Sequence, residues 1–253
     1  MKINSGNAFL AIIFVSIVSQ TALSETRVKS RYIGEKPMAI DGDLGEWRGF
    51  GKRNRSIEFT VLDEKAILRG RDAWKDDTDL RAEFAFAHND KALYLAIRIN
   101  DQELVRSNQN LTTEDHVEIW FGLPQKGKTP ARSFGIGIFP DPDKNKVTIR
   151  TLVHGKDRGI GRIRGVESAI MGMNSFYTIE ATIPFDALLG EDVLVSDLRA
   201  GVYVIDRDKS SSAVSETVFG TAPENAKGST TVLPRLDQIT LKSRVQSIDI
   251  LLN

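Results

Sequence analysis

The sequence has no cysteine and only three histidine residues, His88, His116 and His154, among its 253 residues. The lack of Cys excludes disulfide bonds, lipid attachment through a thiol and a Cys nucleophile. The histidines form no His-x-x-x-His pair, and no Gly-x-Ser-x-Gly sequence is present. We therefore expect a protein that is not an enzyme.

An excess of charge of one sign is also lacking. The chain carries 34 Lys plus Arg residues and 34 Asp plus Glu residues, so its formal net charge is zero. A protein that binds nucleic acid or an anionic membrane through charge usually has an excess of Lys and Arg. The balance predicts that nucleic acid is not a partner.

Long apolar runs are scarce, and the one near the N-terminus is short. Lys2 is followed by an apolar run from Phe9 to Val18 and then by mostly small residues up to Ser24. This layout predicts a secretory signal peptide over residues 1–24, cleaved after Ser24, since the run is too short to span a bilayer. An uncleaved N-terminal anchor is the alternative. We expect a secreted or periplasmic mature chain, residues 25–253, without a membrane span.

The mature chain is expected to be a single domain, because no segment has the composition of a linker and no short period repeats. Its clearest pattern is a hairpin, in which the alternating runs 82–86 and 93–99 flank the turn 88–91. Further short runs rich in Val, Ile or aromatic residues predict strands at 117–121, 134–139, 147–153, 177–183, 202–206 and 238–241.

Short strands of this kind predict an all-β fold, an antiparallel β-sandwich of the jelly-roll or immunoglobulin type. Helix is scarce. A short helical turn is expected near residues 184–189, because Pro184 stands at its start and Gly190 just after its end. The apolar spacing in residues 243–253 predicts a terminal amphipathic helix that folds back onto the sandwich.

Several motifs occur in a specific order. They are Ile40-Asp41-Gly42 followed by Trp47, Asn89-Asp90 followed by Leu93-Tyr94-Leu95 and Asp101, Asp115-x-Val117-Glu118, and Tyr177-x-Ile179-Glu180-Ala181-x-Ile183-Pro184. Over residues 36–242 the chain resembles the family 9 carbohydrate-binding modules, which belong to the DOMON-like β-sandwich superfamily. Gly42 can take a positive φ, and Trp47 is expected in the core.

The resemblance implies a carbohydrate or glycan ligand, held between two Trp rings and a set of polar side chains. The stretches that correspond to these Trp residues, 110–114 and 227–233, contain no aromatic residue. Gly135 and Gly137 replace the family's Arg and Asn, so that Glu118 is what remains of the polar set. The resemblance therefore implies a carbohydrate-binding module with a diverged ligand site.

Four residues are candidates for the ligand site. Strand alternation places His116, Glu118 and Trp120 on one face. Trp120 is expected either to form the floor of a rebuilt pocket or to cover two glycines of a neighbouring strand as ordinary packing. Trp74 lies in a polar stretch and is expected to be the most exposed aromatic residue, either in contact with a ligand or packed at a sheet edge.

The family resemblance also allows a structural calcium ion, and no other cofactor is predicted. The carboxylate-rich segments 76–79 and 206–208 are the candidates, with solvated turns as the alternative. Segment 141–145 begins like a calcium loop but lacks the required Gly and Glu further on. The basic, glycine-rich segment 155–165 is expected to be a solvated hairpin or, alternatively, a contact for an acidic glycan.

Two other function classes stay open. The superfamily includes periplasmic electron-transfer domains that carry haem, for which Met171 or Met173 with His116 or His154 are candidate iron ligands. Met also commonly fills gaps between sheets. Because a fold does not fix a function, an envelope interaction module without a small ligand is the third class.

Overall fold

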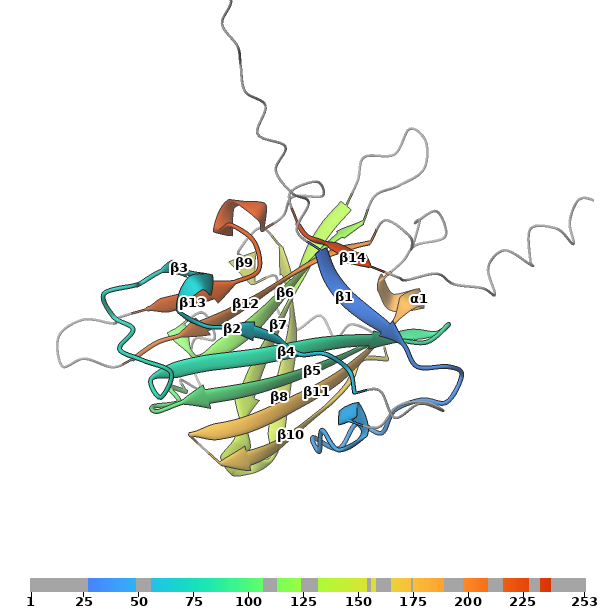
Figure 1. The fold of residues 1–253 in the computed structure, drawn as a ribbon, viewed down its shortest axis with the longest axis horizontal. Coiled ribbons are helices and arrows are strands. Elements are labelled where there is room, and N and C mark those ends of the chain that lie inside the picture. The colour runs from blue at the N-terminus through green and yellow to red at the C-terminus, as the bar shows by residue number, and fades with distance from the viewer. Residues whose placement is uncertain are drawn as a thin grey trace, which may run out of the picture.

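The computed structural model describes residues 27–48, 56–106, 113–123, 132–153, 156–157, 165–173, 175–188, 198–208, 216–227 and 233–237. In these residues the chain forms two β-sheets that pack face to face (Figure 1). The all-β antiparallel sandwich predicted from the strand patterns is confirmed. Within the described ranges, no helix is long and apolar enough to cross a membrane.

The first sheet lies at the front of Figure 1 in the order β10-β11-β5-β4, with β2 along the far edge of β4. All of these neighbours are antiparallel. Asn89 closes the tight turn between β4 and β5, since its Oδ1 accepts hydrogen bonds from the N–H groups of Lys91 and Ala92 at 2.8 and 2.9 Å. The strands are β2 Thr60–Leu62, β4 Leu80–His88, β5 Ala92–Asp101, β10 Glu167–Met173 and β11 Phe176–Pro184.

The second sheet lies behind the first in the order β14-β12-β6-β7-β8-β9, and β13 and β3 extend it beside β12. These pairings are antiparallel as well. The strands are β3 Ile67–Arg69, β6 His116–Leu123, β7 Arg132–Asp141, β8 Lys146–Val153, β9 Lys156–Asp157, β12 Arg199–Asp206, β13 Thr217–Gly220 and β14 Arg235–Asp237.

Strand β1, Arg27–Tyr32, joins the two sheets. Its first half, Arg27–Lys29, pairs in parallel with β14, and its second half, Ser30–Tyr32, pairs in parallel with β4. The helical elements are short and lie in the connections: α1 Phe185–Leu188, η1 Glu46–Arg48, η2 Glu64–Ala66, η4 Pro142–Lys144 and η6 Glu224–Ala226.

The main core fills the space between the sheets with alternate side chains of facing strands. Phe84 and Phe86 on β4 and Ile119 and Phe121 on β6 all point into it and are fully or almost fully buried. Their spacing of two residues is the period that predicted these strands from the sequence. Burial of this apolar surface is the main source of stability, because the chain has no disulfide.

The expected hairpin is confirmed, and each expected strand in the described ranges is present and somewhat longer than predicted. The helical turn near 184–189 is α1. The expected closing strand 238–241 and terminal helix 243–253 lie outside the described residues. Strands β1, β2, β3, β9, β10, β13 and β14 were not predicted, because they are short or carry many polar residues.

A buried carboxylate on β11, Glu180, fixes the N-terminal motif. Its Oε1 accepts a hydrogen bond from Trp47 Nε1 at 2.6 Å, and its Oε2 accepts the N–H groups of Asp41 and Gly42 at 3.1 and 2.8 Å. Gly42 has a φ of 88°, and a Cβ there would lie 2.8 Å from the backbone of Ile170. Trp47 has no exposed surface, so its expected place in the core is confirmed.

Trp47 belongs to a second, smaller core on the outer face of the first sheet. Side chains from residues 33–47 and 57–59 pack there against small residues and a Tyr of β4 and β5. The buried members are Met38, Leu44, Trp47, Ile57, Ala85, Ala87, Ala92, Tyr94 and Ala96. The N-terminal segment therefore covers one half of this face.

Replacing Glu180 with Ala is expected to destabilise the protein by about 3 kcal/mol, because the buried N–H groups of Gly42 and of the Trp47 ring, and the partly buried N–H of Asp41, lose their acceptor. Urea-induced unfolding measures the change. Glu167→Ala, an exposed substitution on the adjacent strand β10, is the matched control and should change the stability by about 0.5 kcal/mol or less. Equal effects of the two substitutions would contradict the role assigned to Glu180.

Candidate functional site

The first candidate site lies on the outer face of the second sheet, along β6. The side chains of His116, Glu118 and Trp120 share this face, and the residues between them point into the main core. The structure thus brings together three of the four residues that the sequence suggested. Lys227, which follows η6, joins them, and we call these four residues the Glu118 cluster.

Glu118 connects the cluster. Its Oε2 accepts a hydrogen bond from Trp120 Nε1 at 2.9 Å and pairs with Lys227 Nζ at 2.8 Å, and its Oε1 lies 3.4 Å from His116 Nε2. Its side chain is only 12% exposed. Burial alone would raise the pKa of Glu118, but the hydrogen bond from His116 and the charge of Lys227 lower it to about 2. Glu118 is therefore an ionised carboxylate that is paired within the protein.

Trp120 packs against glycine. Its ring lies so close to Gly135 on β7 that a Cβ there would be 2.8 Å from the ring. The side chain has no exposed surface and belongs to an apolar cluster on this face. Of the two interpretations that the sequence left open, this geometry corresponds to packing. A sugar would reach the ring only if the side chains that cover it moved.

The cover comes from the chain that follows β13. Lys227 Nζ lies 4.6 Å from the centre of the Tyr203 ring, and Tyr203 Oη donates a hydrogen bond to the carbonyl of Pro223 at 3.2 Å. Leu233 packs in the same apolar cluster. Residues 110–112 and 228–232, which include most of the stretches where the family has its Trp residues, lie outside the described residues. The second stretch begins with Lys227, whose ammonium group lies over the Tyr203 ring on the outer face of the second sheet.

Trp74 lies apart from the Glu118 cluster, in the turn before β4. Its Nε1 donates a hydrogen bond to the carbonyl of Leu80 at 2.9 Å, and its ring lies 6.4 Å from that of Phe219. The guanidinium of Arg71 lies over the indole ring, 5.3 Å from its centre. Trp74 is half-buried, so the expectation that it is the most exposed aromatic residue was wrong. The turn folds back and packs the indole at the sheet edge.

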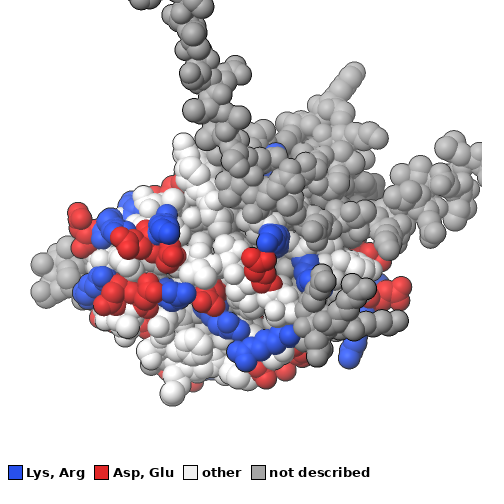
Figure 2. All heavy atoms as spheres, viewed as in Figure 1, with Lys and Arg blue, Asp and Glu red and all other residues white. Residues whose placement is uncertain are grey.

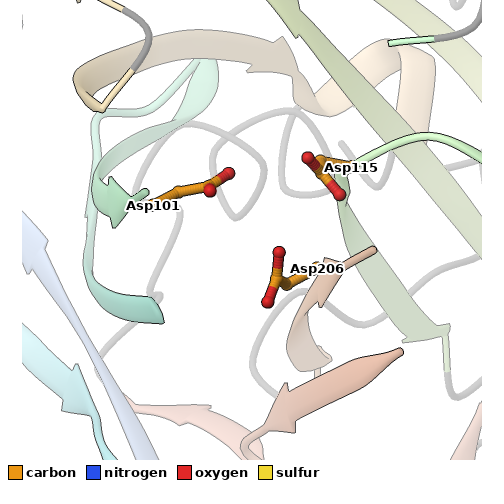
Figure 3. A group of neighbouring side chains, drawn as sticks. All are labelled: Asp101, Asp115 and Asp206. Carbon is orange, nitrogen blue, oxygen red and sulfur yellow. The ribbon is translucent and has the colours of Figure 1, made fainter. Parts of the chain in front are cut away.

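A second candidate site lies at one end of the sandwich, where three aspartates face one another (Figure 3). Asp101 ends β5 in the first sheet, whereas Asp115 directly precedes β6 and Asp206 ends β12 in the second. One oxygen of each carboxylate lies within 4.8 Å of the other two, and all three residues are buried. We call these three residues the acidic centre.

The hydrogen bonds of the acidic centre leave part of it unsatisfied. Asp115 accepts hydrogen bonds from the backbone N–H groups of Val105 and Arg207, the latter at 2.6 Å. Asp101 accepts one from a backbone N–H two residues further on, at 2.8 Å. Asp206 Oδ1 is buried and has no hydrogen-bond partner in the described part of the chain. A buried oxygen in this state is costly unless a ligand or a proton meets it.

The electrostatics of the centre point the same way. Burial, followed by the charges of the neighbouring carboxylates, raises the pKa of Asp101 to about 7, of Asp115 to about 8 and of Asp206 to about 9. The guanidinium of Arg207 pairs with Glu216 instead of these carboxylates. At neutral pH the centre must therefore hold protons or a cation.

The donor set suits a hard divalent cation. Carboxylate oxygens are preferred ligands of Ca²⁺, and the three residues present only oxygen atoms. A cation would meet the unpartnered Asp206 Oδ1, so the residues present fit this group. Of the two segments suggested from the sequence, 206–208 contributes to the centre through Asp206. Segment 76–79 uses its carboxylates in local hydrogen bonds and ion pairs.

The candidate haem ligands do not come together. Met171 and Met173 are exposed on the outer face of the first sheet, whereas His116 lies on the outer face of the second. His154 lies outside the described residues. The Met–His pair that the sequence allowed with His116 is therefore not assembled in this fold.

Asp101 and Asp115 were not suggested from the sequence as members of a carboxylate cluster, although both stand in motifs that mark the ends of strands. Their meeting with Asp206 follows from the topology, because antiparallel pairing of β6 with β12 places the start of one strand beside the end of the other. The sequence signal for this cluster is thus an Asp at the end of three strands that meet at one end of the sandwich. It can be recognised only once the strand order is known.

Comparison with family models matches residues 59–227 to the family described as "Carbohydrate family 9 binding domain-like". Among solved structures, a carbohydrate-binding module of family 9 from Caldicellulosiruptor kristjanssonii in complex with glucose has 17% identity and a TM-score of 0.53, covering 85% of this chain and 100% of its own. The same organism's module in complex with cellotriose has 17% identity and a TM-score of 0.51, covering 84% and 95%. These likenesses show the fold. The comparison with curated proteins found no match.

The resistance of the protein to acid is expected to depend on Glu118. Because its pKa of about 2 in the folded protein lies below its ordinary value of 4.5, the charged form stabilises the fold fully above pH 4.5, and this contribution is lost as the pH falls toward 2. It amounts to about 3 kcal/mol.

Urea-induced unfolding of the wild type and of Glu118→Gln, at about pH 6 and about pH 2.5, measures this contribution. The stability difference between the two proteins should shrink at the lower pH. The other titratable groups around Glu118 are the same in both proteins: His116 and Lys227 face Glu118, and Tyr203 lies beneath Lys227. A difference that stays constant with pH would contradict the assignment.

Proposed function

Because the chain belongs to the carbohydrate family 9 binding domain-like family, we propose that it is the non-catalytic carbohydrate-binding module of an exported protein. The family match over residues 59–227 carries the proposal, since it runs from the start of β2 past η6 and includes strands of both sheets. The two solved relatives, in complex with glucose and with cellotriose, support a ligand that contains glucose.

Export and the lack of catalysis rest on the sequence. The apolar run before Ser24 favours a signal peptide over residues 1–24, which lie outside the described residues, and hence a secreted or periplasmic mature chain. The sequence offers no Cys nucleophile and no His-x-x-x-His pair.

The assignment of Trp74, His116, Glu118 and Trp120 as ligand-binding residues stays a prediction. A ligand role for the last three requires that Lys227 and its neighbours move, because Glu118 is already paired and Trp120 is fully buried. In this proposal the family's ligand face is diverged in its polar groups and covered by the chain's own Lys227.

A glycan array probed with the mature protein tests the proposed function. We expect binding to oligosaccharides that contain glucose, confirmed by calorimetric titration with cellotriose, without release of reducing sugar. Binding to no carbohydrate on the array would contradict the proposal. Hydrolysis of a bound oligosaccharide would contradict its non-catalytic part.

We also propose that the acidic centre binds Ca²⁺, on the observation that Asp206 Oδ1 is buried without a partner. Asp101, Asp115 and Asp206 would supply carboxylate oxygens from both sheets. The ion would neutralise the buried negative charge there, so that its role is to stabilise the fold.

Adding Ca²⁺ to the chelator-treated protein is expected to raise the melting temperature. An ion at about 100 times its dissociation constant adds about 2.7 kcal/mol of stability. Asp206→Asn should stabilise the metal-free protein at neutral pH, because the Asp206 carboxyl, whose pKa burial raises to about 9, must take up a proton on folding, and the substitution should abolish the response to Ca²⁺. Asp72→Asn, at an exposed position, is the matched control. An unchanged Ca²⁺ response in Asp206→Asn would contradict the site.

A further inference from the structure

The outer face of the first sheet is half covered and half open. The second core, around Trp47, covers one half. The open half has a hollow of about 250 Å³ that is lined by side chains of β4, β5 and β11. We call its five lining residues the outer groove: Arg81, Glu83, Arg98, Asn100 and Phe176. The Glu118 cluster lies on the outer face of the other sheet, so the two places are separate.

The strand register arranges the groove in two rows. Arg81, Asn100 and Phe176 stand directly opposite one another on three adjacent strands, and Glu83 stands opposite Arg98 in the next row on the same face. Neighbouring strands lie about 4.8 Å apart, so these side chains are held close together by a paired backbone. The groove is therefore built on a rigid part of the fold.

Phe176 gives the groove an exposed aromatic face. Its side chain is 52% exposed, and among the aromatic residues that the structure describes only Tyr32 is also exposed. Met173 stands opposite Phe176 on β10 and is 79% exposed, and Met171 continues the apolar surface. Figure 2 shows this face, with charged side chains gathered over β3 and the left end of β4 and an uncharged area near the turn from β10 to β11. Exposed apolar surface next to polar groups often marks a binding site.

The polar side chains of the groove are held in place but keep hydrogen-bonding capacity. The guanidinium of Arg98 lies 4.4 Å from the ring centre of Phe59, and its Nη1 is 3.4 Å from Glu83 Oε2. Arg81 Nη2 is likewise 3.4 Å from Glu83 Oε1, and Asn100 Nδ2 donates to a backbone carbonyl at 3.4 Å. These are long contacts, so ligand hydroxyl groups can replace them at little cost.

The charges of the groove balance. Arg81 and Arg98 are matched by Glu83 and by Asp77, which pairs with Arg81. Planar amide, carboxylate and guanidinium groups offer both donors and acceptors to hydroxyl groups. Balanced charge gives no advantage to an anionic ligand, and so favours a neutral sugar.

We propose that the outer groove binds a neutral glycan chain, with a pyranose ring against Phe176 and its hydroxyl groups on Arg98, Asn100 and Glu83. The C–H face of the sugar packs on the aromatic ring, while Arg98, Asn100 and Glu83 form hydrogen bonds with the hydroxyl groups at its edge. This inference rests on the proposed function and assigns its ligand to a site other than the Glu118 cluster. Met171 and Met173 extend the surface for a neighbouring sugar unit.

Calorimetric titration of the mature protein with cellotriose, and with the tightest-binding neutral oligosaccharide of the array, tests the groove. Phe176→Ala and Asn100→Ala should each weaken binding at least about tenfold, which corresponds to about 1.4 kcal/mol. Tyr32→Ala, which removes the other exposed aromatic ring, is the matched control and should bind like the wild type. Trp120→Phe, which keeps a ring on Gly135, probes the Glu118 cluster. Melting temperatures establish that each variant is folded.

The outcomes separate the site from the function. If Phe176→Ala and Asn100→Ala bind glycan like the wild type, the outer groove is overturned as the site but the carbohydrate-binding function is not. If binding is then lost in Trp120→Phe, the ligand lies at the Glu118 cluster. No binding of the wild type to any glycan overturns both. A protein partner that is captured by the wild type and lost in Phe176→Ala, without glycan binding, overturns the groove as a sugar site and identifies a protein-docking surface.

Discussion

A carboxylate that is buried away from water needs hydrogen-bond donors or a cation as partners. This requirement determines how the covering segments are attached to the two sheets. Glu180 accepts hydrogen bonds from three N–H groups of the N-terminal motif, which fastens residues 33–47 to the outer face of the first sheet. Glu118 is met by Trp120, Lys227 and His116, which fasten the chain after β13 to the second sheet. Each buried acid holds a covering segment in place.

The acidic centre meets the constraint differently. Backbone N–H groups satisfy part of Asp101 and Asp115, but no side-chain cation of the described residues joins them and Asp206 keeps an unpartnered oxygen. A bound Ca²⁺ would complete the set and connect the two sheets at that end. The first two carboxylates stand in motifs that carry the family resemblance, so the resemblance marks scaffold residues as much as ligand residues.

The sequence predicted the fold well, because its strands alternate with a period of two and its motifs lie in the family order. The hairpin, the core position of Trp47 and the shared face of His116, Glu118 and Trp120 all follow from local patterns. Strand β1 was missed because four of its six residues are Arg, Lys or Ser, so that its sequence shows no alternation of apolar residues. The acidic centre was missed because only the three-dimensional strand order brings its members together. The expected exposure of Trp74 was wrong, since the turn before β4 gives its indole a backbone acceptor.

Which outer face of the sandwich is covered and which is open could be established only from the structure. The face with Glu118 is closed by the chain's own Lys227, whereas the face with Phe176 is open and carries polar groups in strand register. Nothing in the local sequence distinguishes an exposed Phe176 from the buried Tyr177 beside it, apart from strand alternation. The ligand site proposed for this chain thus moves from the closed face to the open one, while Glu118 and Glu180 hold the segments that cover the two sheets.

Electron density at the acidic centre, in crystals of the mature protein grown with Ca²⁺, tests the central claim most directly. The account predicts a single ion bound by oxygens of Asp101, Asp115 and Asp206 at about 2.3 to 2.6 Å. An empty centre, with two of the carboxylates joined by a shared proton in the presence of Ca²⁺, would contradict it.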